Sequence, residues 1–245
     1  MSSIYTASRA DLRKLFTDSR KEKVRANYER LLKAFSKQEL EQQLDKGEGE
    51  IVDSINEMAA TAGADNANVE VFTALGLTDF YYPDTEAEIA FEISDKVDPA
   101  SITKYEQLTS AFETSTPVDC RVSSGEETLN FQIKRYPYPH LEFTPEAIVS
   151  WFEKVIGHYG DMSDTKLCIL LQPSGDYKEG VLDIGKVTTG IQALSEQISF
   201  NEVVFTYNEG MQHMVLHKVH PEAKRLLIPL DWALARMRGD IALNF

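Results

Sequence analysis

The sequence is poor in cysteine, in long apolar stretches and in basic charge. Its two cysteines, Cys120 and Cys168, both lie in apolar runs, so we predict buried free thiols rather than a disulfide framework. No run of about 18 apolar residues occurs, which argues against a membrane-spanning helix. The first nine residues lack the apolar segment of a signal peptide. We therefore expect a cytoplasmic protein that does not associate with membranes.

Several common catalytic motifs are also absent. The chain has no Gly-rich phosphate-binding loop, no Gly-x-Ser-x-Gly motif and no Cys-x-x-Cys pair. Any chemistry must therefore rest on polar side chains that could hold a metal ion.

The charge is strongly acidic but unevenly spread. The formal net charge of −14 argues against a general nucleic-acid coat, because phosphate contact depends on Lys and Arg. Residues 9–33, however, hold nine basic and four acidic residues, which is +5 locally and leaves −19 for the rest. This asymmetry allows a nucleic-acid-facing arm, with Arg20, Lys21 and Lys23 as candidate contacts. The alternative is a solvated helical face with paired charges.

The composition, 42% hydrophobic and 26% charged, is that of a globular protein. Residues 1–64 predict a helical N-terminal arm or subdomain, with Ser8 capping the first helix through Asp11. We expect further helices there over residues 18–35, 37–46 and 50–61. Residues 65–245 predict an α/β core with a mixed sheet and a C-terminal strand-helix extension.

The core segments follow from periodicity and from capping residues. A helix is expected over 66–75, ending at Gly76, with an extended segment over 78–82. Residues 86–93 predict the first strand of the core, at a sheet edge. Further helices are predicted over 101–112, 144–158, 186–198 and 230–238, and further strands over 166–171, 201–207, 212–219 and 225–229.

One predicted hairpin carries the most informative polar residues. Val118, Cys120 and Val122 alternate with polar residues, and Leu129, Phe131 and Ile133 do the same in the next strand. A two-residue loop at Gly125 and Glu126 makes paired residue numbers sum to 251, which puts Asp119 opposite Gln132. Asp119, Gln132 and Lys134 then share one face, where a carboxylate, an amide oxygen and an ammonium could serve Mg²⁺-assisted phosphodiester hydrolysis. The alternative is an ordinary solvated hairpin face.

These residues resemble the motif of the PD-(D/E)XK nuclease superfamily, an Asp on one strand and (Glu/Gln)-x-Lys on the next. The pattern is closest to the N-terminal nuclease domains of type I restriction subunits and to Mrr-type enzymes with Gln-x-Lys. The resemblance implies a restriction-endonuclease-like α-β-β-β-α-β core and a Mg²⁺ or Mn²⁺ ion. The implied ligands are Asp119, the Gln132 side-chain oxygen, the Ile133 carbonyl and Glu70, with Lys134 orienting the attacking water.

Some roles at this predicted site stay open. Glu70 matches the Glu-bearing helix of the family, but Glu88 or Glu92 could replace it if the polar face of their strand is the one carrying Asp119. Arg135 and Tyr136 could contact a phosphate or stack on a base. The alternative for Tyr136 is a packed loop aromatic.

The function implied by the resemblance is that of a hydrolase, a metal-dependent endonuclease binding DNA in restriction or antiviral (anti-phage) defence. The alternative is a catalytically inactive nuclease-fold subunit that serves binding or assembly. An RNase or a tRNA-directed toxin on the same scaffold also stays open. The resemblance further allows a homodimer or a larger defence complex.

Overall fold

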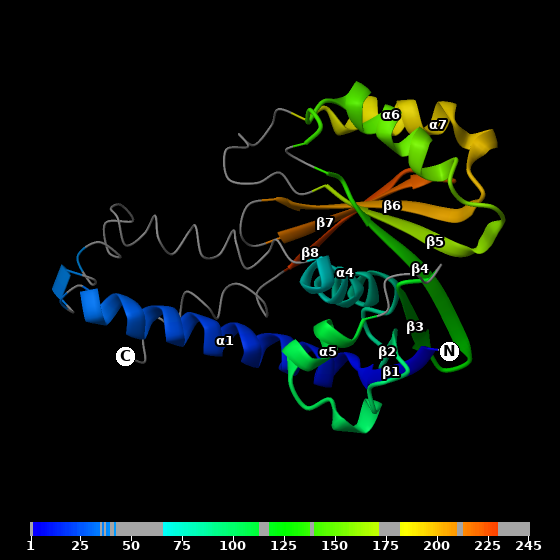
Figure 1. Ribbon diagram of the computed structural model, residues 1–245. Helices are drawn as coiled ribbons and strands as arrows, with labels where there is room; N and C mark the ends of the chain where they lie inside the picture. The colour runs from blue at the N-terminus through cyan, green and yellow to red at the C-terminus, as the bar shows by residue number, and fades with distance from the viewer. Residues whose placement is uncertain are drawn as a thin grey trace.

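The structure is a computed structural model, and it describes residues 2–34, 36, 38–39, 42, 66–112, 118–137, 140–171, 182–209 and 213–229. The described residues form a mixed α/β fold around one eight-stranded sheet in the order β1 to β8 (Figure 1). The strands are β1 (Ser2–Ser8), β2 (Glu88–Ser94), β3 (Cys120–Ser124), β4 (Glu127–Arg135), β5 (Met162–Leu170), β6 (Phe200–Glu209), β7 (His213–His220) and β8 (Lys224–Pro229). The helices are α1 (Arg9–Ala34), α4 (Asn66–Tyr81), α5 (Tyr105–Ala111), α6 (Pro145–Ile156) and α7 (Ile184–Ala193), with short 3-10 turns at Pro99–Ser101 and Ser195–Gln197.

The sheet combines antiparallel and parallel pairing. Strands β1 to β4 are antiparallel neighbours, β4, β5 and β6 run parallel, and β6 to β8 are antiparallel again. The two parallel steps are made by crossovers that contain α6 and α7, as parallel neighbours require.

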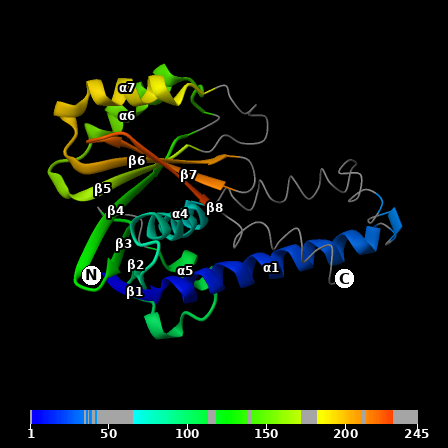
Figure 2. The same ribbon diagram turned by 180° about the vertical axis from the view of Figure 1, so that it is seen from behind.

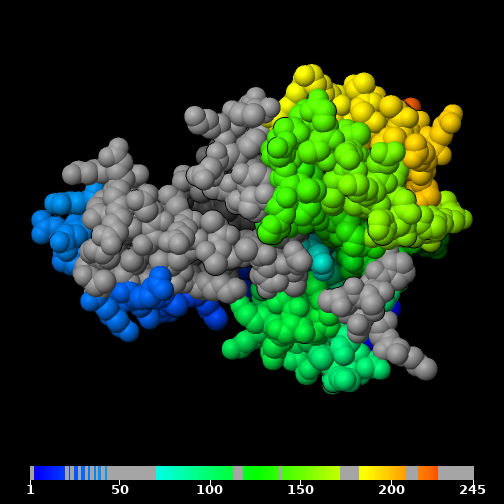
Figure 3. Space-filling model, turned by 45° about the horizontal axis from the view of Figure 1, so that its top comes forward, coloured from blue at the N-terminus to red at the C-terminus, as the bar shows by residue number. Residues whose placement is uncertain are grey.

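Helices cover the two faces of the sheet, as the two opposite ribbon views show (Figures 1 and 2). One face packs against α1, α4 and α5, and its core includes Leu75, Phe91 and Phe131. The other face packs against α6 and α7, with Phe152, Leu167 and Phe205 in its core. In the space-filling view only a small cyan area of α4 is visible between green segments (Figure 3). Because β5 is buried on both faces, its continuous apolar run is confirmed as a central strand.

The N-terminal segment differs from its prediction. Residues 2–8 form β1, which pairs with β2 along its whole length, and α1 is one continuous helix instead of two. No Gly or Pro interrupts residues 9–34, and Ser19, near the expected break, donates a hydrogen bond to Glu106 at 2.5 Å instead of capping a new helix. The predicted cap is confirmed, since Asp11 N donates to Ser8 Oγ at 3.1 Å. The helices predicted over 37–46 and 50–61, and the boundary at 64, fall almost entirely outside the described residues.

Helix α4 is longer than predicted, and the expected end at Gly76 and extended segment over 78–82 were wrong. Gly76, Leu77 and Thr78 are buried in the helix, and Thr78 Oγ1 donates to Ala74 O at 2.7 Å. Packing against the sheet therefore outweighs the low helix propensity of glycine. Pro83, just past the end of α4, is the residue that cannot continue it.

The predicted first strand is confirmed as β2, but not as an edge strand, because β1 lies outside it. The alternation is as expected, with Ile89, Phe91 and Ile93 buried. The predicted hairpins and the strand at 225–229 are also confirmed. The helix predicted over 230–238 lies outside the described residues.

Candidate metal and phosphate site

The candidate site lies where β3 separates from β4. Cys120 pairs with Phe131, so the predicted register is confirmed, and Gly125 in the loop has a φ of 61°. Asp119 directly precedes β3, and its N–H donates to Phe131 O at 2.9 Å. The register therefore brings Asp119 beside Gln132, as the sequence predicts.

The Asp119 carboxylate closes the open end of the hairpin. Its Oδ2 atom accepts a short hydrogen bond from Gln132 Nε2 and another from Ile133 N at 2.5 Å. Because β3 begins only at Cys120, its pairing with β4 does not extend as far as Ile133. The carboxylate supplies the acceptor that the missing strand would otherwise provide.

Burial changes the acidity of this carboxylate. It raises the pKa of Asp119 to about 6, against the opposing effects of the Ile133 hydrogen bond and the Lys134 charge. A carboxylate that is costly to ionise in the bare protein gains from a cation placed beside it. This environment therefore suits a bound metal ion.

Gln132 supplies the second oxygen. Its side chain is 1% exposed, and its Nε2 is used by Asp119. Within the described part of the chain, Gln132 Oε1 is buried and has no hydrogen-bond donor. A buried amide oxygen without a donor costs about 1–3 kcal/mol, so such an atom calls for an explanation, for which a water or an ion is the usual choice.

Lys134 lies on the same face as Gln132, one alternation further along β4. Their partners on β5, Leu167 and Ile169, both belong to the core under α6 and α7. The Lys134 side chain is half-buried, with Nζ 6.0 Å from the centroid of the Tyr159 ring. Its charge lowers the pKa of Asp119, so the ammonium and the carboxylate act on each other.

Glu70 reaches the same end of the sheet from α4. Burial is the main reason that the pKa of the Cys120 thiol is raised, and the charges of Asp119 and Glu70 both add to it. The two carboxylates therefore lie within electrostatic reach of one buried thiol. Cys120 belongs to the core on the α4 side, so Glu70 approaches from the opposite face to Gln132 and Lys134.

The alternative acidic ligands have different surroundings. Glu88 is exposed and pairs with Ser123, well along β3 from Asp119. Glu92 lies one position beyond the last β2–β3 pair, in line with Asp119. Its Oε1 accepts a hydrogen bond from Arg121 Nη2 at 2.7 Å, so this carboxylate is already engaged.

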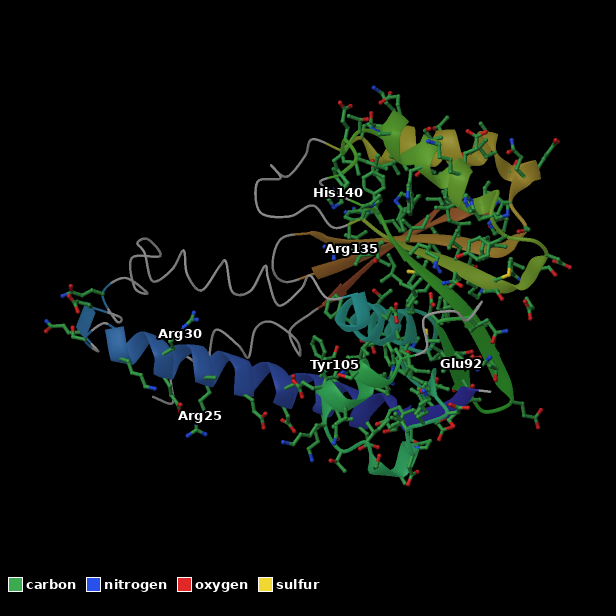
Figure 4. All side chains as sticks on the ribbon, viewed as in Figure 1. Arg25, Arg30, Glu92, Tyr105, Arg135 and His140 are labelled. Atoms are coloured by element: carbon green, nitrogen blue, oxygen red, sulfur yellow. The ribbon has the colours of Figure 1, made fainter. Side chains whose placement is uncertain are left out.

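Not all of the residues predicted to contact nucleic acid lie where they could do so. Tyr136 is fully buried between Phe143 and Trp151, so it is the packed aromatic and cannot stack on a base. Arg135 is half-buried at the end of β4, and in the stick view it is labelled just below His140 (Figure 4). The three remaining candidates, Arg20, Lys21 and Lys23, belong to α1.

Two polar groups are not predicted as site residues by the sequence pattern. Arg121, two residues after Asp119, belongs to the alternation of the hairpin, and this spacing puts it on the face of Asp119. A second cluster joins α4 to the sheet, where Tyr81 OH donates to Glu202 and two ammoniums lie near the same carboxylate. Lys166 Nζ and Lys218 Nζ are 3.4 and 3.5 Å from Glu202 Oε2. Local periodicity does not pair Glu202 with Tyr81 or Lys166, which are 121 and 36 positions away in the chain.

No group of three or more His, Cys, Asp or Glu side chains suited to a metal ion occurs in the described ranges. The available side-chain donors on this face are thus one carboxylate and one amide oxygen, because Glu70 lies on the opposite face. The Ile133 carbonyl, implied as a ligand by the resemblance, stays a prediction. This set agrees with Mg²⁺, which takes few carboxylates and keeps several waters.

Comparison with known proteins finds no matching family model, no matching curated protein and no matching solved structure. The fold itself defines the class, an α/β protein with an eight-stranded mixed sheet. Among the described helices, none is long and apolar enough to cross a membrane.

Proposed function

We propose that this protein is a Mg²⁺-dependent endonuclease that hydrolyses phosphodiester bonds in DNA. The observation that carries the proposal is the buried Gln132 Oε1 atom, which has no donor in the described residues although its amide nitrogen is tied to Asp119. An oxygen held in this way, beside a buried carboxylate, has the properties of a ligand for a hard cation.

The order of elements supports the proposal. Helix α4 is followed by β2, β3 and β4, then by α6 and β5, with β5 parallel to β4. With α5 inserted between β2 and β3, this order is compatible with the α-β-β-β-α-β core that the PD-(D/E)XK resemblance implies. Asp119 directly precedes the second of these strands, and Gln132 and Lys134 lie in the third, in the order of the motif.

Each residue then has a role. Asp119 and Gln132 would hold the ion, and Glu70, which lies on the opposite face of the sheet, would not be one of its ligands. The ion would polarise the phosphoryl oxygen and help to form hydroxide from water. The Lys134 ammonium would orient that water and offset the charge that develops on the phosphate. The Ile133 N–H keeps the Asp119 carboxylate in place for this purpose.

Cleavage of supercoiled plasmid with and without Mg²⁺ or Mn²⁺ tests the proposal. We expect nicking or linearisation by the wild type and at least a 100-fold loss in Lys134→Ala, since lost charge stabilisation of this kind costs about 10²–10³ in rate. Lys186→Ala, which removes an exposed lysine from α7, is the matched control and should cut normally. Equal activity of wild type and Lys134→Ala would show that cleavage, if present, uses another site.

The second candidate is a nuclease-fold subunit without activity, serving binding or assembly. The neutral Gln132 favours it, because one metal ligand then lacks a charge. Wild-type protein that cuts neither DNA nor RNA with any divalent metal would support this reading, whereas cleavage of RNA alone would change the substrate and not the site. A cytoplasmic role in anti-phage defence, as a homodimer or in a larger complex, belongs to the same proposal.

A further inference from the structure

Asp119 lies on the same face of the sheet as α6 and α7. Where this face continues over β1, β2 and β3, it is polar and partly exposed. Cys120 and Val122 point into the core on the α4 side, so Asp119 and Arg121 point to the other side. The core beneath α6 and α7 contains no residue of β1, β2 or β3. Ile4 on β1, which pairs with Glu92 on β2, is 52% exposed, as expected for an uncovered face.

Arg121 is the cation nearest to Asp119 along this strand. Two residues of strand separate their Cα atoms by roughly 6.6 Å. Arg121 pairs with Ala90 on β2 and with Asn130 on β4, so small or neutral side chains flank it on both sides. Its side chain is 30% exposed, so it is only partly covered by its neighbours.

Glu92 fixes the guanidinium without using all its donors. Arg121 Nη2 donates a hydrogen bond to Glu92 Oε1 at 2.7 Å. A guanidinium has five N–H donors in a rigid plane, and its fork matches two oxygens of a phosphate. The pair therefore presents an oriented cation whose remaining donors can bind an anion.

We propose that Arg121 binds the backbone phosphate next to the one being cut, with Glu92 as the positioning residue that holds its guanidinium. The inference rests on the proposed function, and it assigns a polynucleotide, not an isolated phosphate ester, as the substrate of the site. A mononucleotide has no second phosphodiester for Arg121 to bind. Within the strongly acidic chain, such a fixed cation also offsets the repulsion of Glu88 and Glu92 toward the substrate.

The test is the affinity for a fluorescently labelled DNA oligonucleotide, measured by anisotropy in Ca²⁺ so that cleavage is suppressed. We expect Arg121→Ala to weaken binding about tenfold and to reduce the slope of log affinity against log salt by about one. Arg121→Lys, which keeps the charge but loses the fork, should recover the salt slope and only part of the affinity. Glu92→Gln should bind as tightly as the wild type or more tightly, because it keeps an acceptor for Arg121 and removes a negative charge.

The Lys186→Ala control should leave both affinity and slope unchanged. Thermal unfolding of each variant shows whether it is folded, and Arg121→Lys serves if Arg121→Ala is not. If the wild-type protein cleaves DNA but its Arg121 variants bind DNA with unaltered affinity and salt slope, this inference is overturned and the proposed function stands. Wild-type protein that neither binds nor cuts DNA or RNA would overturn both.

Discussion

The side-chain amide of Gln132 donates a hydrogen bond to Oδ2 of Asp119 at the point where β3 begins. The same carboxylate oxygen accepts from the Ile133 N–H. Both donors are provided by β4, so the acid is held by the strand that also carries Lys134. The acidity of Asp119 and the orientation of the Gln132 side-chain amide therefore both depend on the hairpin.

Stability should depend on pH through Asp119. Burial raises its pKa in the folded protein to about 6, above the ordinary value of 3.8. The folded state therefore holds more protons than the unfolded state between these values, and this group's contribution is lost as the pH rises through about 6. Asp119→Asn removes the titration, so its free energy of unfolding relative to wild type should rise by up to roughly 3 kcal/mol between pH 4 and pH 7.

Urea unfolding in EDTA at several pH values measures this difference. Asp84→Asn, at an exposed position, is the control and should show no pH-dependent difference. A constant difference between Asp119→Asn and wild type would mean that Asp119 keeps an ordinary pKa.

Metal binding should respond to the charge at position 132. Gln132→Glu adds a second carboxylate, and a unit charge at about 4 Å contributes roughly 1–4 kcal/mol, so Mg²⁺ affinity should rise about tenfold or more. Without metal the same variant should be less stable than wild type, because two carboxylates then meet in a buried place. Gln132→Leu should bind Mg²⁺ more weakly than wild type. Calorimetric titration and the Mg²⁺-dependent rise in Tm measure these effects, and identical Mg²⁺ responses in all three proteins would exclude Gln132 as a ligand.

The Glu202 cluster should contribute to stability and not to cleavage. Glu202→Ala leaves Lys166 and Lys218 without their shared carboxylate, which we expect to cost about 3 kcal/mol. Glu202→Gln keeps an acceptor for Tyr81 and should cost less. Chemical denaturation measures the loss, and metal-dependent plasmid cleavage by the folded variant should be unchanged. Loss of cleavage in folded Glu202→Gln would place this cluster in the active site.

The contact between α6 and α7 depends on a glycine. A Cβ atom at Gly190 would lie 2.6 Å from Val149 Cγ2, which is too close for two carbons. Gly190→Ala should therefore lower the free energy of unfolding by about 1–3 kcal/mol. Adding Val149→Ala should restore part of it, whereas Gly160→Ala, where nothing lies within 4 Å, is the control. A fully additive double variant would mean that the two side chains do not meet.

The local sequence was sufficient to predict those elements whose residue pattern does not depend on distant parts of the chain. Strict alternation with Gly125 between the two strands predicted the β3–β4 hairpin and its register, because side chains on a strand have a period of two. Thr144 followed by Pro145 predicted the start of α6, and Thr144 Oγ1 accepts from Ala147 N at 3.2 Å. The placement of Asp119 beside Gln132 followed from the register alone.

Tertiary structure decided what depends on partners distant in the chain. Gly76 predicts a helix end by its own propensity, but packing on the sheet continues α4 through it. The strand β1 was not foreseen, because a short polar segment becomes a strand only when β2 offers its edge. The engagement of Glu92 by Arg121 and the contacts of Glu202 with Tyr81 and Lys166 join residues at least 29 positions apart, and the burial of Gln132 depends on helices that cover the sheet. Local periodicity carries no information on such contacts, since it registers only neighbours within a turn or a strand.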